Sequence, residues 1–434
     1  MTNVQLLYCL SAGALRLRRG YPVLRQAVVL IGSPDAQLGD QTATTPKSML
    51  HVAGRPFLDT LIDEIVRYDA FEEILLLAGH QAERVLARYS AAVRGRARLT
   101  IALEQEPLGT AGALAHAIDR LQNRFLLLNG ASFFDFNLLD LVWRADSSLV
   151  HMALRADTIG DRSDRVVLEN DRVRAFVAPG HGAAGPTDAG VYVIDRSIVD
   201  GIDRLPASLE LDVLPALAAG GTLRGTCYRG YFVDVGTAKD LASAEIALKE
   251  RLRRPAVFFD RDGVLNHDTG YIFEARELKW VDGAREAVKA VNDAGYFAFV
   301  VSNQSGVARG LYDESDIRSL HRWMADEMAL MGAHIDAFEY CPDHPEGTIE
   351  RYRRASDRRK PAPGMITDLL SRFPVNADDS MLIGDKASDL EAAQAAGLKG
   401  HLFSGGNLEA FVKQHLRPRF VNAANPTWKI QTGL

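Results

Sequence analysis

A short apolar run that ends abruptly in two carboxylates constrains this chain more than any other stretch. The residues Ala256 to Phe259 predict a strand that is buried on both faces, because the run has no polar position. Asp260 and Asp262 follow it two residues apart. An extended backbone points such residues to the same side, here beyond the carboxyl end of the strand. In open α/β sheets ligands bind at that end, so the sequence predicts a ligand site here.

The same two carboxylates also predict a cation. Like charges this close repel each other unless a cation lies between them, and hard oxygen ligands favour a divalent ion such as Mg²⁺. Gly263, directly after Asp262, lets the backbone turn sharply. A pair of turn-forming aspartates at a strand end is the alternative interpretation of an isolated D-x-D-G.

Three later stretches favour a phosphate pocket over a simple turn. Each carries polar groups after a strand-like run or in a proline-stiffened loop: Ser302, Asn303, Gln304 and Ser305 after Tyr296 to Val301, Arg359 and Lys360 beside Pro361 and Pro363, and Asp385, Lys386 and Asp389 after Met381 to Ile383. Hydroxyl, amide and backbone N–H groups donate to phosphate oxygens. Because strand ends meet at one edge of a sheet, one pocket would collect carboxylates, a hydroxyl and cations.

These motifs together resemble the haloacid dehalogenase superfamily of phosphohydrolases. Asp260 and Asp262 match its first motif, Ser302 the second, Lys360 the third, and Asp385 with Asp389 the fourth. Within the superfamily, FFDRDGVLNHDTGYI, VVSNQSGVARGLY, RKPAPGM and LIGDKASDL resemble the D-glycero-D-manno-heptose 1,7-bisphosphate 7-phosphatases, whose nearest relatives are histidinol-phosphate phosphatases. The match runs from about Pro255 to Phe403.

The resemblance implies a role for each motif residue. Asp260 would attack phosphorus and become an aspartyl phosphate, and Asp262 would act first as general acid and then as general base. Mg²⁺ would be held by Asp260, the main-chain carbonyl of Asp262 and Asp385. Ser302 and Lys360 would stabilise the transferring phosphoryl group.

The resemblance also implies a substrate-binding set. Its members are Asp268, Thr269, Gly270, Tyr271, Ser302, Asn303, Gln304, Ser305, Arg359, Lys360 and Lys386. The loop from His267 to Tyr271 would lie over the active site, and Arg359 would bind the distal phosphate. An ordinary turn and a solvated arginine are the alternative interpretations.

The zinc loop of that family departs from its pattern here. The four ligand positions are Cys341, Asp343, Ser356 and Arg358, so one ligand type survives of four, although His344 lies next door. A thiolate with a carboxylate and no fixed partners is not a structural zinc site. We therefore expect Mg²⁺ as the cofactor and no zinc.

The amino-terminal half alternates apolar runs with helical patterns, which predicts a second α/β unit. The predicted strands are Ala27 to Ile31, Ile74 to Ala78, Leu99 to Leu103 and Phe125 to Leu128, with helices after Pro56, Gln81 and Gly112. The expected fold class is thus α/β with two domains, each a mostly parallel sheet flanked by helices. One is nucleotidyltransferase-like and Rossmann-type, and the other is haloacid dehalogenase-like and Rossmannoid.

This half resembles the sugar-1-phosphate nucleotidyltransferases, particularly the mannose-1-phosphate and heptose-1-phosphate guanylyltransferase branch. The blocks that carry the resemblance are AVVLIGS, TTPKSML, EPLGTAGAL, LLLNGASFFD, DAGVYVI, SLELDVLP and GYFVDVGTAKDL. The matching family positions include Lys47, Glu106, Gly109, Glu210 and Asp234. They are interpreted as vestigial, because the departures fall on the working groups.

Three departures argue against nucleotidyl transfer. The arginine of the family's glycine-rich loop is Gln37, the metal-binding aspartate is Ala131, and a lysine of the family corresponds to Ala178. One remaining carboxylate is a poor magnesium site, and losing an arginine that stabilises phosphoryl charge costs about 10³ to 10⁵ in rate. The prediction is a degenerate domain that binds a nucleotide or sugar phosphate, or that serves assembly of a homo-oligomer.

The chain divides into segments that follow these matches. They are an extension over 1–24, the nucleotidyltransferase-like domain over 25–237, a linker helix over 238–254, the phosphatase domain over 255–420 and a tail over 421–434. A net charge of -6 argues against nucleic acid as a partner. Three scattered cysteines and the lack of a 20-residue apolar run favour a cytoplasmic protein with no membrane segment.

The leading functional prediction is removal of the 7-phosphate of a heptose bisphosphate, which would supply nucleotide-heptose synthesis for surface lipopolysaccharide. One alternative is a bifunctional enzyme with an active sugar-1-phosphate nucleotidyltransferase. Another is a histidinol-phosphate-type phosphatase with a binding domain at its amino terminus.

Overall fold

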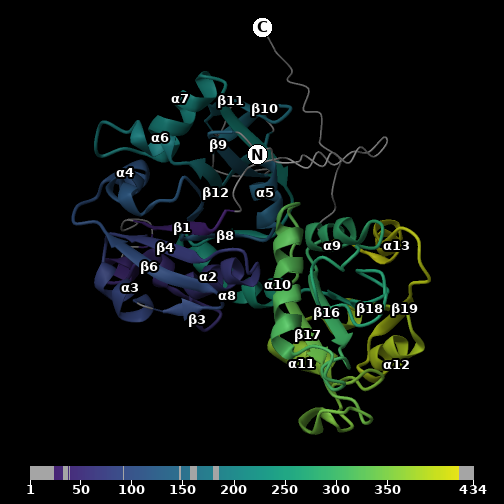
Figure 1. Ribbon diagram of the computed structural model, residues 1–434. Helices are drawn as coiled ribbons and strands as arrows, with labels where there is room; N and C mark the ends of the chain where they lie inside the picture. Colours follow the sequence, from purple (N-terminus) through teal and green to yellow (C-terminus); the bar gives the residue numbers. More distant parts are fainter. Residues whose placement is uncertain are drawn as a thin grey trace, which may run out of the picture.

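The computed structural model describes residues 24–32, 38, 40–90, 92–145, 148–156, 164–178 and 185–419. Within these residues the chain forms one sheet of ten strands and one of five strands, with two small two-stranded sheets. Figure 1 shows the two large sheets side by side, with helix α10 (Glu314–Ala329) between them. The predicted tail lies outside the described residues, as does the predicted extension apart from Leu24.

The ten-stranded sheet comes from the amino-terminal part and runs in the order β10-β11-β13-β9-β12-β7-β1-β4-β6-β5. Its strands are β1 (Gln26–Ile31), β4 (Glu73–Ala78), β5 (Val93–Arg94), β6 (Ala97–Leu103), β7 (Arg124–Asn129), β9 (Val150–Arg155), β10 (Arg165–Glu169), β11 (Arg172–Val177), β12 (Thr187–Asp195) and β13 (Leu223–Tyr228). Beside it lie the pairs β2 (His51–Val52) with β3 (Arg55–Pro56) and β8 (Ser132–Phe134) with β14 (Phe232–Asp234).

Helices cover both faces of this sheet, and an apolar cluster fills the space on each side. One face is covered by α2 (Phe57–Arg67), α3 (Ala82–Tyr89) and α5 (Leu138–Arg144), and the other by α4 (Gly109–His116), α6 (Ser197–Asp200) and α7 (Leu214–Ala219). The short α1 (Asp40–Ala43) and the longer α8 (Ala238–Leu252) complete the helices of this part. All four predicted strands are present, but the helix predicted after Gly112 begins at Gly109.

The prediction of a mostly parallel sheet holds for only one side of the ten-stranded sheet. Strands β7, β1, β4 and β6 are parallel, whereas β12 runs antiparallel to both β7 and β9. A parallel pair needs a long crossover, usually a helix. Between β9 and β12 the chain forms the antiparallel pair β10 and β11 instead, so β12 returns in the opposite direction.

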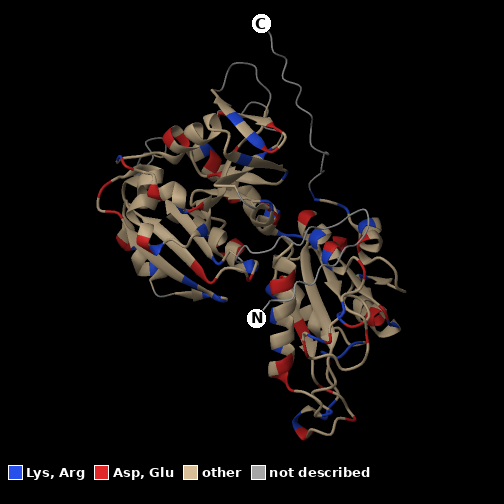
Figure 2. Cartoon of the chain, turned by 45° about the horizontal axis from the view of Figure 1, so that its top comes forward, with Lys and Arg blue, Asp and Glu red and all other residues tan. Residues whose placement is uncertain are grey.

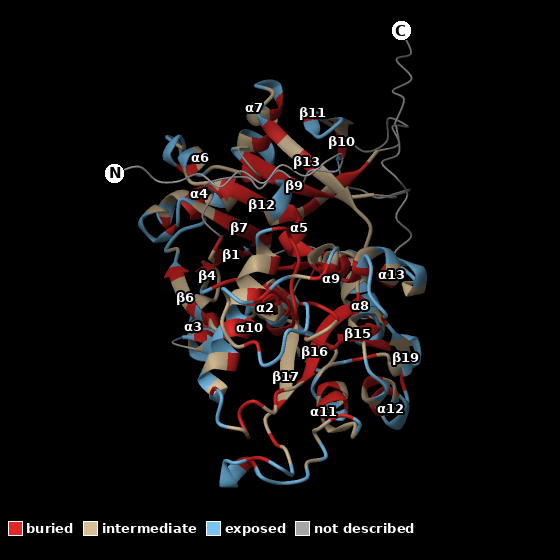
Figure 3. Cartoon of the chain, turned by 45° about the vertical axis from the view of Figure 1, so that its right-hand side comes forward, coloured by how far each residue is buried: buried red, intermediate tan, exposed pale blue. Residues whose placement is uncertain are grey.

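The five-stranded sheet of the carboxyl-terminal part is parallel throughout, as predicted, in the order β17-β16-β15-β18-β19. Its strands are β15 (Ala256–Phe259), β16 (Phe297–Asn303), β17 (Ala337–Cys341), β18 (Met381–Gly384) and β19 (Lys399–Leu402). One face packs on α9 (Ala284–Asp293), α10 and α13 (Leu408–His415), and the other on α11 (Gly364–Arg372) and α12 (Ala387–Ala395). Figure 3 shows buried residues concentrated in the strands of both sheets.

One predicted helix start in this part is wrong. The sequence predicts a capping box of Ser388 with Glu391, but α12 begins at Ala387 with Lys386 as its N-cap. The Lys386 backbone N–H donates to Asp389 Oδ2 at 3.0 Å. Because an aspartate three residues into the helix satisfies the N-cap N–H, the helix starts earlier than predicted.

Buried charges join the two parts of the chain. Arg254, between α8 and β15, is 2% exposed, and its Nη2 lies 2.9 Å from Glu64 Oε2 and 2.8 Å from Asp135 Oδ1. Burial raises the pKa of Glu64, but the Arg254 and Arg67 guanidiniums outweigh it and lower that pKa to about 2. Arg67 Nη1 in turn lies 2.7 Å from Asp336 Oδ1 of the carboxyl-terminal part.

The same interface contains further polar contacts from α5 and the residues before it. Lys289 Nζ lies 2.5 Å from Asp140 Oδ1, and Asn137 Nδ2 donates to Asp293 Oδ1 and to the carbonyl of Gly332, each at 2.8 Å. Such groups are costly to bury unless they are paired. The pairing therefore specifies how the two parts dock.

The surface carries mixed charge. Figure 2 shows Lys and Arg interspersed with Asp and Glu over both parts. Among the described helices, none combines the length and the apolar character that crossing a bilayer needs.

Candidate active site

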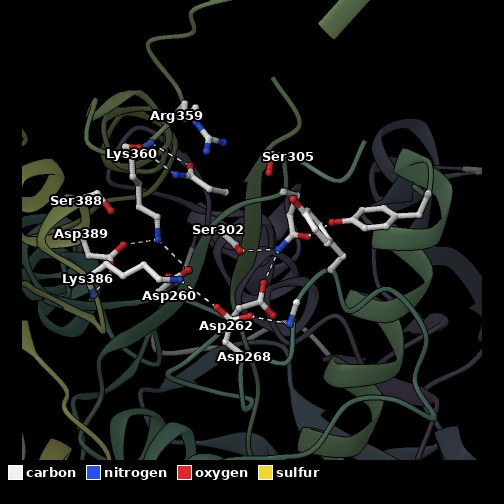
Figure 4. A pocket seen from close by; sticks show the side chains of 15 residues that line it. Asp260, Asp262, Asp268, Ser302, Ser305, Arg359, Lys360, Lys386, Ser388 and Asp389 are labelled. Carbon is white, nitrogen blue, oxygen red and sulfur yellow. Dashed lines mark hydrogen bonds and ion pairs between the residues drawn. The ribbon is translucent and has the colours of Figure 1, made fainter. Parts of the chain in front are cut away.

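The carboxyl ends of three adjacent strands meet at one cavity. Strand β15 lies between β16 and β18, so Asp260, Ser302 and Asp385 come to the same edge of the sheet. A cavity of about 460 Å³ opens there (Figure 4). Its lining includes Asp260, Asp262, Asp268, Gly270, Tyr271, Ser302, Asn303, Gln304, Ser305, Arg359, Lys360, Lys386 and Asp389. Of the predicted substrate-binding set, Thr269 alone is absent from this lining; it is exposed.

Three carboxylates form the acidic centre of this site. Oxygens of Asp260, Asp385 and Asp389 lie within 4.8 Å of one another. Gly263 lets the Asp385 carboxylate lie close to the first-motif backbone, because a Cβ placed at position 263 would stand 2.3 Å from Asp385 Oδ2. Its φ of +95° also favours glycine. A side chain at position 263 would therefore displace Asp385.

Lys360 reaches into the acidic centre from the third motif. Its Nζ lies 2.8 Å from Asp260 Oδ1 and 2.6 Å from Asp389 Oδ1, and it donates to the carbonyl of Val301 at 2.9 Å. Burial raises the pKa of Asp260 to about 6, an effect that Lys360 opposes and Asp389 reinforces. Burial lowers the pKa of Lys360, but its two carboxylate neighbours outweigh burial and raise it. The centre thus carries more negative charge than one lysine balances.

The donor set of the acidic centre fits Mg²⁺. Asp385 Oδ1 is buried and has no hydrogen-bond donor among the described residues. Burial raises the pKa of Asp385, with Lys386 opposing and Asp389 adding to the effect. Clustered carboxylate oxygens with an unmet acceptor and excess negative charge are what a hard divalent cation satisfies. The geometry brings the predicted ligands Asp260 and Asp385 together and adds Asp389.

Three side chains donate hydrogen bonds to the Asp262 carboxylate. Its Oδ1 accepts from Arg261 Nε at 3.1 Å and from Asn266 Nδ2 at 2.9 Å. Its Oδ2 accepts from Arg261 Nη2 at 2.9 Å and from Gln304 Nε2 at 2.8 Å. The carboxylate therefore has one fixed orientation at the cavity wall (Figure 4).

The second motif is tied to both of its neighbours. Gln304 Nε2 also donates to Ser302 Oγ at 2.8 Å. Asn303 Nδ2 donates to the carbonyl of Lys360, and the Lys360 N–H donates to Asn303 Oδ1, each at 3.0 Å. The side-chain amides of Asn303 and Gln304 thus have protein partners as well as facing the cavity, and that of Asn303 holds the lysine loop against strand β16.

The loop from His267 to Tyr271, predicted to lie over the active site and here called the specificity loop, reaches the fourth motif. Asp268 Oδ2 lies 3.1 Å from Lys386 Nζ, while Tyr271 is 48% exposed at the rim. Arg359 Nη1 donates to the carbonyl of Asp343 at 3.3 Å. Figure 4 shows Arg359 well away from Asp262, on the side from which Lys360 enters. Charged side chains therefore lie at two separate places on the cavity wall: the pair of Asp268 with Lys386 at one, and Arg359 at the other.

The positions of the family's zinc ligands are engaged in other contacts. Asp343 Oδ2 lies 3.0 Å from Arg354 Nε, and Arg358 pairs with Glu339 and Asp368. Cys341 is buried. The expectation of no zinc stays a prediction.

Several site residues escaped the sequence analysis. Arg261 and Asn266 lie inside the first motif but drew no role, and Asp389 was matched to the fourth motif without a place among the metal ligands. Tyr312, whose hydroxyl donates to Gln304 Oε1 at 2.8 Å, ends the block VVSNQSGVARGLY but has no predicted role, because its contact with Gln304 forms only when the loop that precedes α10 folds back. The DRDG pattern could have revealed Arg261, since a cation between two acids has an obvious local partner.

The predicted nucleotidyltransferase positions make fewer contacts with one another than the phosphatase residues do. Lys47 Nζ lies 3.3 Å from Asp234 Oδ1, and Glu210 Oε2 accepts from the hydroxyls of Thr110 at 2.6 Å and Ser208 at 2.9 Å. Glu106 is exposed, and Gly109 has a φ of +76°.

The position of the missing metal ligand is apolar in character. Ala131 belongs to a buried cluster with Val52, Phe57 and Phe133. Ala178 is exposed at the end of β11, and Gln37 lies outside the described residues.

Two family models match the chain. The nucleotidyl transferase model matches residues 26–251, and the HAD-hydrolase-like model matches residues 357–424. The chain is 51% identical over 164 residues to a D-glycero-beta-D-manno-heptose-1,7-bisphosphate 7-phosphatase of Rhodopseudomonas palustris, covering 38% of this chain and 91% of that protein. It is 44% identical over 147 residues to a D-glycero-alpha-D-manno-heptose-1,7-bisphosphate 7-phosphatase of Burkholderia mallei, covering 34% and 78%.

A solved structure is also similar to this chain. HddC from Yersinia pseudotuberculosis, solved in complex with GMP-PN, is 22% identical over 52% of this chain and all of its own, with a TM-score of 0.47.

Proposed function

Because the chain belongs to the nucleotidyl transferase family and, through its carboxyl-terminal half, to the haloacid dehalogenase-like heptose-bisphosphate phosphatases, we propose that it removes the 7-phosphate of D-glycero-D-manno-heptose 1,7-bisphosphate. The carboxyl-terminal half is a phosphatase. The observation that carries the proposal is the buried Asp260 at a strand end, beside Lys360 and Asp389 in one cavity, with a carboxylate oxygen of Asp385 within 4.8 Å.

The proposed reaction has two displacements at phosphorus. A carboxylate oxygen of Asp260 forms a bond to phosphorus while the bond from phosphorus to the sugar oxygen breaks, and Asp262 gives its proton to that oxygen. Asp262 then takes a proton from water, which attacks the aspartyl phosphate and releases inorganic phosphate with Asp260 restored. The Ser302 hydroxyl and the Lys360 ammonium stabilise the charge on the transferring group.

Mg²⁺ has a defined place in this proposal. Asp260, the main-chain carbonyl of Asp262 and Asp385 would hold it, with Asp389 next to them. When bound, the ion offsets the repulsion between the Asp260 carboxylate and the phosphate.

We assign substrate recognition to the cavity rim. Asp268, Gly270 and Tyr271 of the loop contact the sugar, and Arg359 binds the distal phosphate, because the cavity between these groups and Asp260 suits a molecule with a phosphate at each end. Relatives of this chain carry names with either anomer, so the anomer preference is part of the test.

The test is phosphate release across a panel of substrates. The panel contains both anomers of the heptose bisphosphate, histidinol phosphate and simple sugar phosphates, each with Mg²⁺ and with a chelator. We expect Mg²⁺-dependent release that is fastest from a heptose bisphosphate, abolished by Asp260→Asn and unchanged by Asp378→Asn, an exposed control. Preference for histidinol phosphate would refute the substrate assignment, and full activity of Asp260→Asn would refute the covalent step.

We further propose that the amino-terminal domain has lost nucleotidyl transfer. Ala131 leaves an apolar cluster where the metal-binding carboxylate should stand, and Lys47 faces Asp234. Incubation of the full-length chain with heptose 1-phosphate, Mg²⁺ and each nucleoside triphosphate should give no nucleotide sugar. Steady formation of any nucleotide sugar would overturn this proposal.

A further inference from the structure

We propose that Arg261, together with Gln304 and Tyr312, is a positioning device that holds the Asp262 carboxylate in the orientation needed to protonate the leaving sugar oxygen. The inference rests on the proposed phosphatase mechanism, adds roles for Arg261 and Tyr312, and gives Gln304, which is predicted to bind substrate, a second role. Arg261 lies between the two aspartates of the first motif in sequence, yet its side chain is wholly buried beneath them.

The contact between Arg261 and Asp262 is multidentate. Nε lies 3.1 Å and Nη2 lies 3.0 Å from Oδ1, and Nη2 lies 2.9 Å from Oδ2. Nη2 also donates to the carbonyl of Ile272 at 2.8 Å, which anchors the guanidinium to the segment after the specificity loop. A planar fork that grips both oxygens of a carboxylate fixes its rotation as well as its position.

Gln304 holds the other side of the same carboxylate. Its Nε2 donates to Asp262 Oδ2 and to Ser302 Oγ, each at 2.8 Å. Its Oε1 accepts from the Tyr312 hydroxyl at 2.8 Å and from Arg261 Nη2 at 3.2 Å. Because two donors face Oε1, the amide orientation is determined, and the N–H groups must point to Asp262 and Ser302.

Stability alone does not account for a buried arginine at this place. Arg261 Nη1 is buried without a hydrogen-bond partner among the described residues. Burying a guanidinium is costly, and apolar side chains of similar volume often serve a fold as well or better. A role in orienting Asp262 accounts for this cost, because a misplacement of about 1 Å near a reacting group can lower the rate about 10²-fold.

Substrates with different leaving groups distinguish a positioning role of Arg261 from a purely structural one. A sugar alkoxide needs a proton as it departs, whereas p-nitrophenolate departs without one. If Arg261 acts through Asp262, its loss slows the first displacement for the sugar ester and spares it for the aryl ester. General collapse of the site slows both.

The experiment measures single-turnover rates of Asp260 phosphorylation with the heptose bisphosphate and with p-nitrophenyl phosphate. The variants are Arg261→Met, Arg261→Lys and Tyr312→Phe, with Asp262→Asn as the reference and Arg318→Met, an exposed residue of α10, as the control. We expect Arg261→Met to lose about 10²-fold or more with the sugar ester, within the range for general acid catalysis, and less than about 3-fold with the aryl ester. Tyr312→Phe should show a smaller loss with the same selectivity, and it keeps the test decisive should Arg261→Met fail to fold.

Two outcomes would overturn the inference. Equal losses with both substrates would make Arg261 structural, and full sugar-ester rates in Arg261→Lys and Tyr312→Phe would make the contacts dispensable. The reference variant keeps the two proposals apart. If Asp262→Asn itself shows no selectivity for leaving group, the acid role in the proposed function fails; if it is selective and the Arg261 variants are not, only the positioning role fails.

Discussion

Removal of Arg254 offers a quantitative test of how the two parts of the chain are held together. The side chain is 2% exposed, and its Nη2 pairs with Glu64 and Asp135, which are 7% and 3% exposed. Breaking a buried pair by removing one partner costs about 3–5 kcal/mol, because the remaining charge stays buried. Glu64 keeps Arg67 and Asp135 keeps Arg419, so we expect Arg254→Met to cost about 3 kcal/mol, at the lower end of that range.

Equilibrium unfolding in urea at pH 7, followed by circular dichroism and by residual phosphatase activity, measures this change. A loss of about 3 kcal/mol lowers the folding equilibrium constant about 100-fold. The matched control is Lys413→Ala, which breaks an exposed pair with Glu409 and should cost less than about 1 kcal/mol.

A triple variant sharpens the result. Arg254→Met combined with Glu64→Gln and Asp135→Asn removes the uncompensated charges and should recover most of the loss. A single variant that loses less than about 1 kcal/mol would refute the account of the interface, since that is the size of an exposed pair. A triple variant as unstable as the single one would also refute it.

Three other perturbations test the acidic groups. Burial raises the pKa of Glu64 and of Asp336, but other contacts outweigh burial and lower each pKa to about 2: Arg254 and Arg67 at Glu64, and Arg67 with hydrogen bonds from His334 and the Ala298 N–H at Asp336. Because these folded-state values lie below the unfolded ones, the stabilisation is complete above about pH 5 and is lost as the pH falls toward 2, which urea unfolding across that range should show. Stability that is flat down to pH 3 would contradict this. Gly263→Ala places a Cβ 2.3 Å from Asp385 Oδ2, so the protein should stay folded by circular dichroism while kcat falls about 10-fold or more, as a misplacement near the reacting atoms predicts. Asp385→Asn should raise the Mg²⁺ concentration needed for half-maximal phosphatase activity at least about 10-fold, and an unchanged Mg²⁺ titration would remove Asp385 from the metal site.

The sequence predicts the three central strands of the carboxyl-terminal sheet, β16, β15 and β18, for a physical reason, whereas the edge strands β17 and β19 are not predicted. Strands buried on both faces are continuous apolar runs, and their ends carry the polar groups, so Phe259, Val301 and Ile383 each mark where a site residue follows. The role of a loop glycine such as Gly263 can also be predicted from the sequence, because the neighbouring Asp385 carboxylate leaves no space for a side chain there.

Other features depend on contacts between residues far apart in the sequence. Glu64, Asp135 and Arg254 look like ordinary surface charges until the two parts dock and bury them. The antiparallel direction of β12 depends on which strands it meets, which periodicity does not encode. The grip of Arg261 on Asp262 is local in sequence, yet the Gln304 and Tyr312 contacts that complete it come from another strand and loop.

The most direct test of the central claim is chemical trapping of the covalent intermediate on Asp260. The full-length chain is mixed with Mg²⁺ and substrate, quenched within one turnover, and reduced with borohydride, which converts an aspartyl phosphate to homoserine; peptide mass spectrometry then reads position 260. We predict homoserine at position 260 only when both substrate and Mg²⁺ are present, and none in Asp260→Asn. Unmodified Asp260 in samples that have released phosphate, with homoserine at another aspartate, would contradict the account.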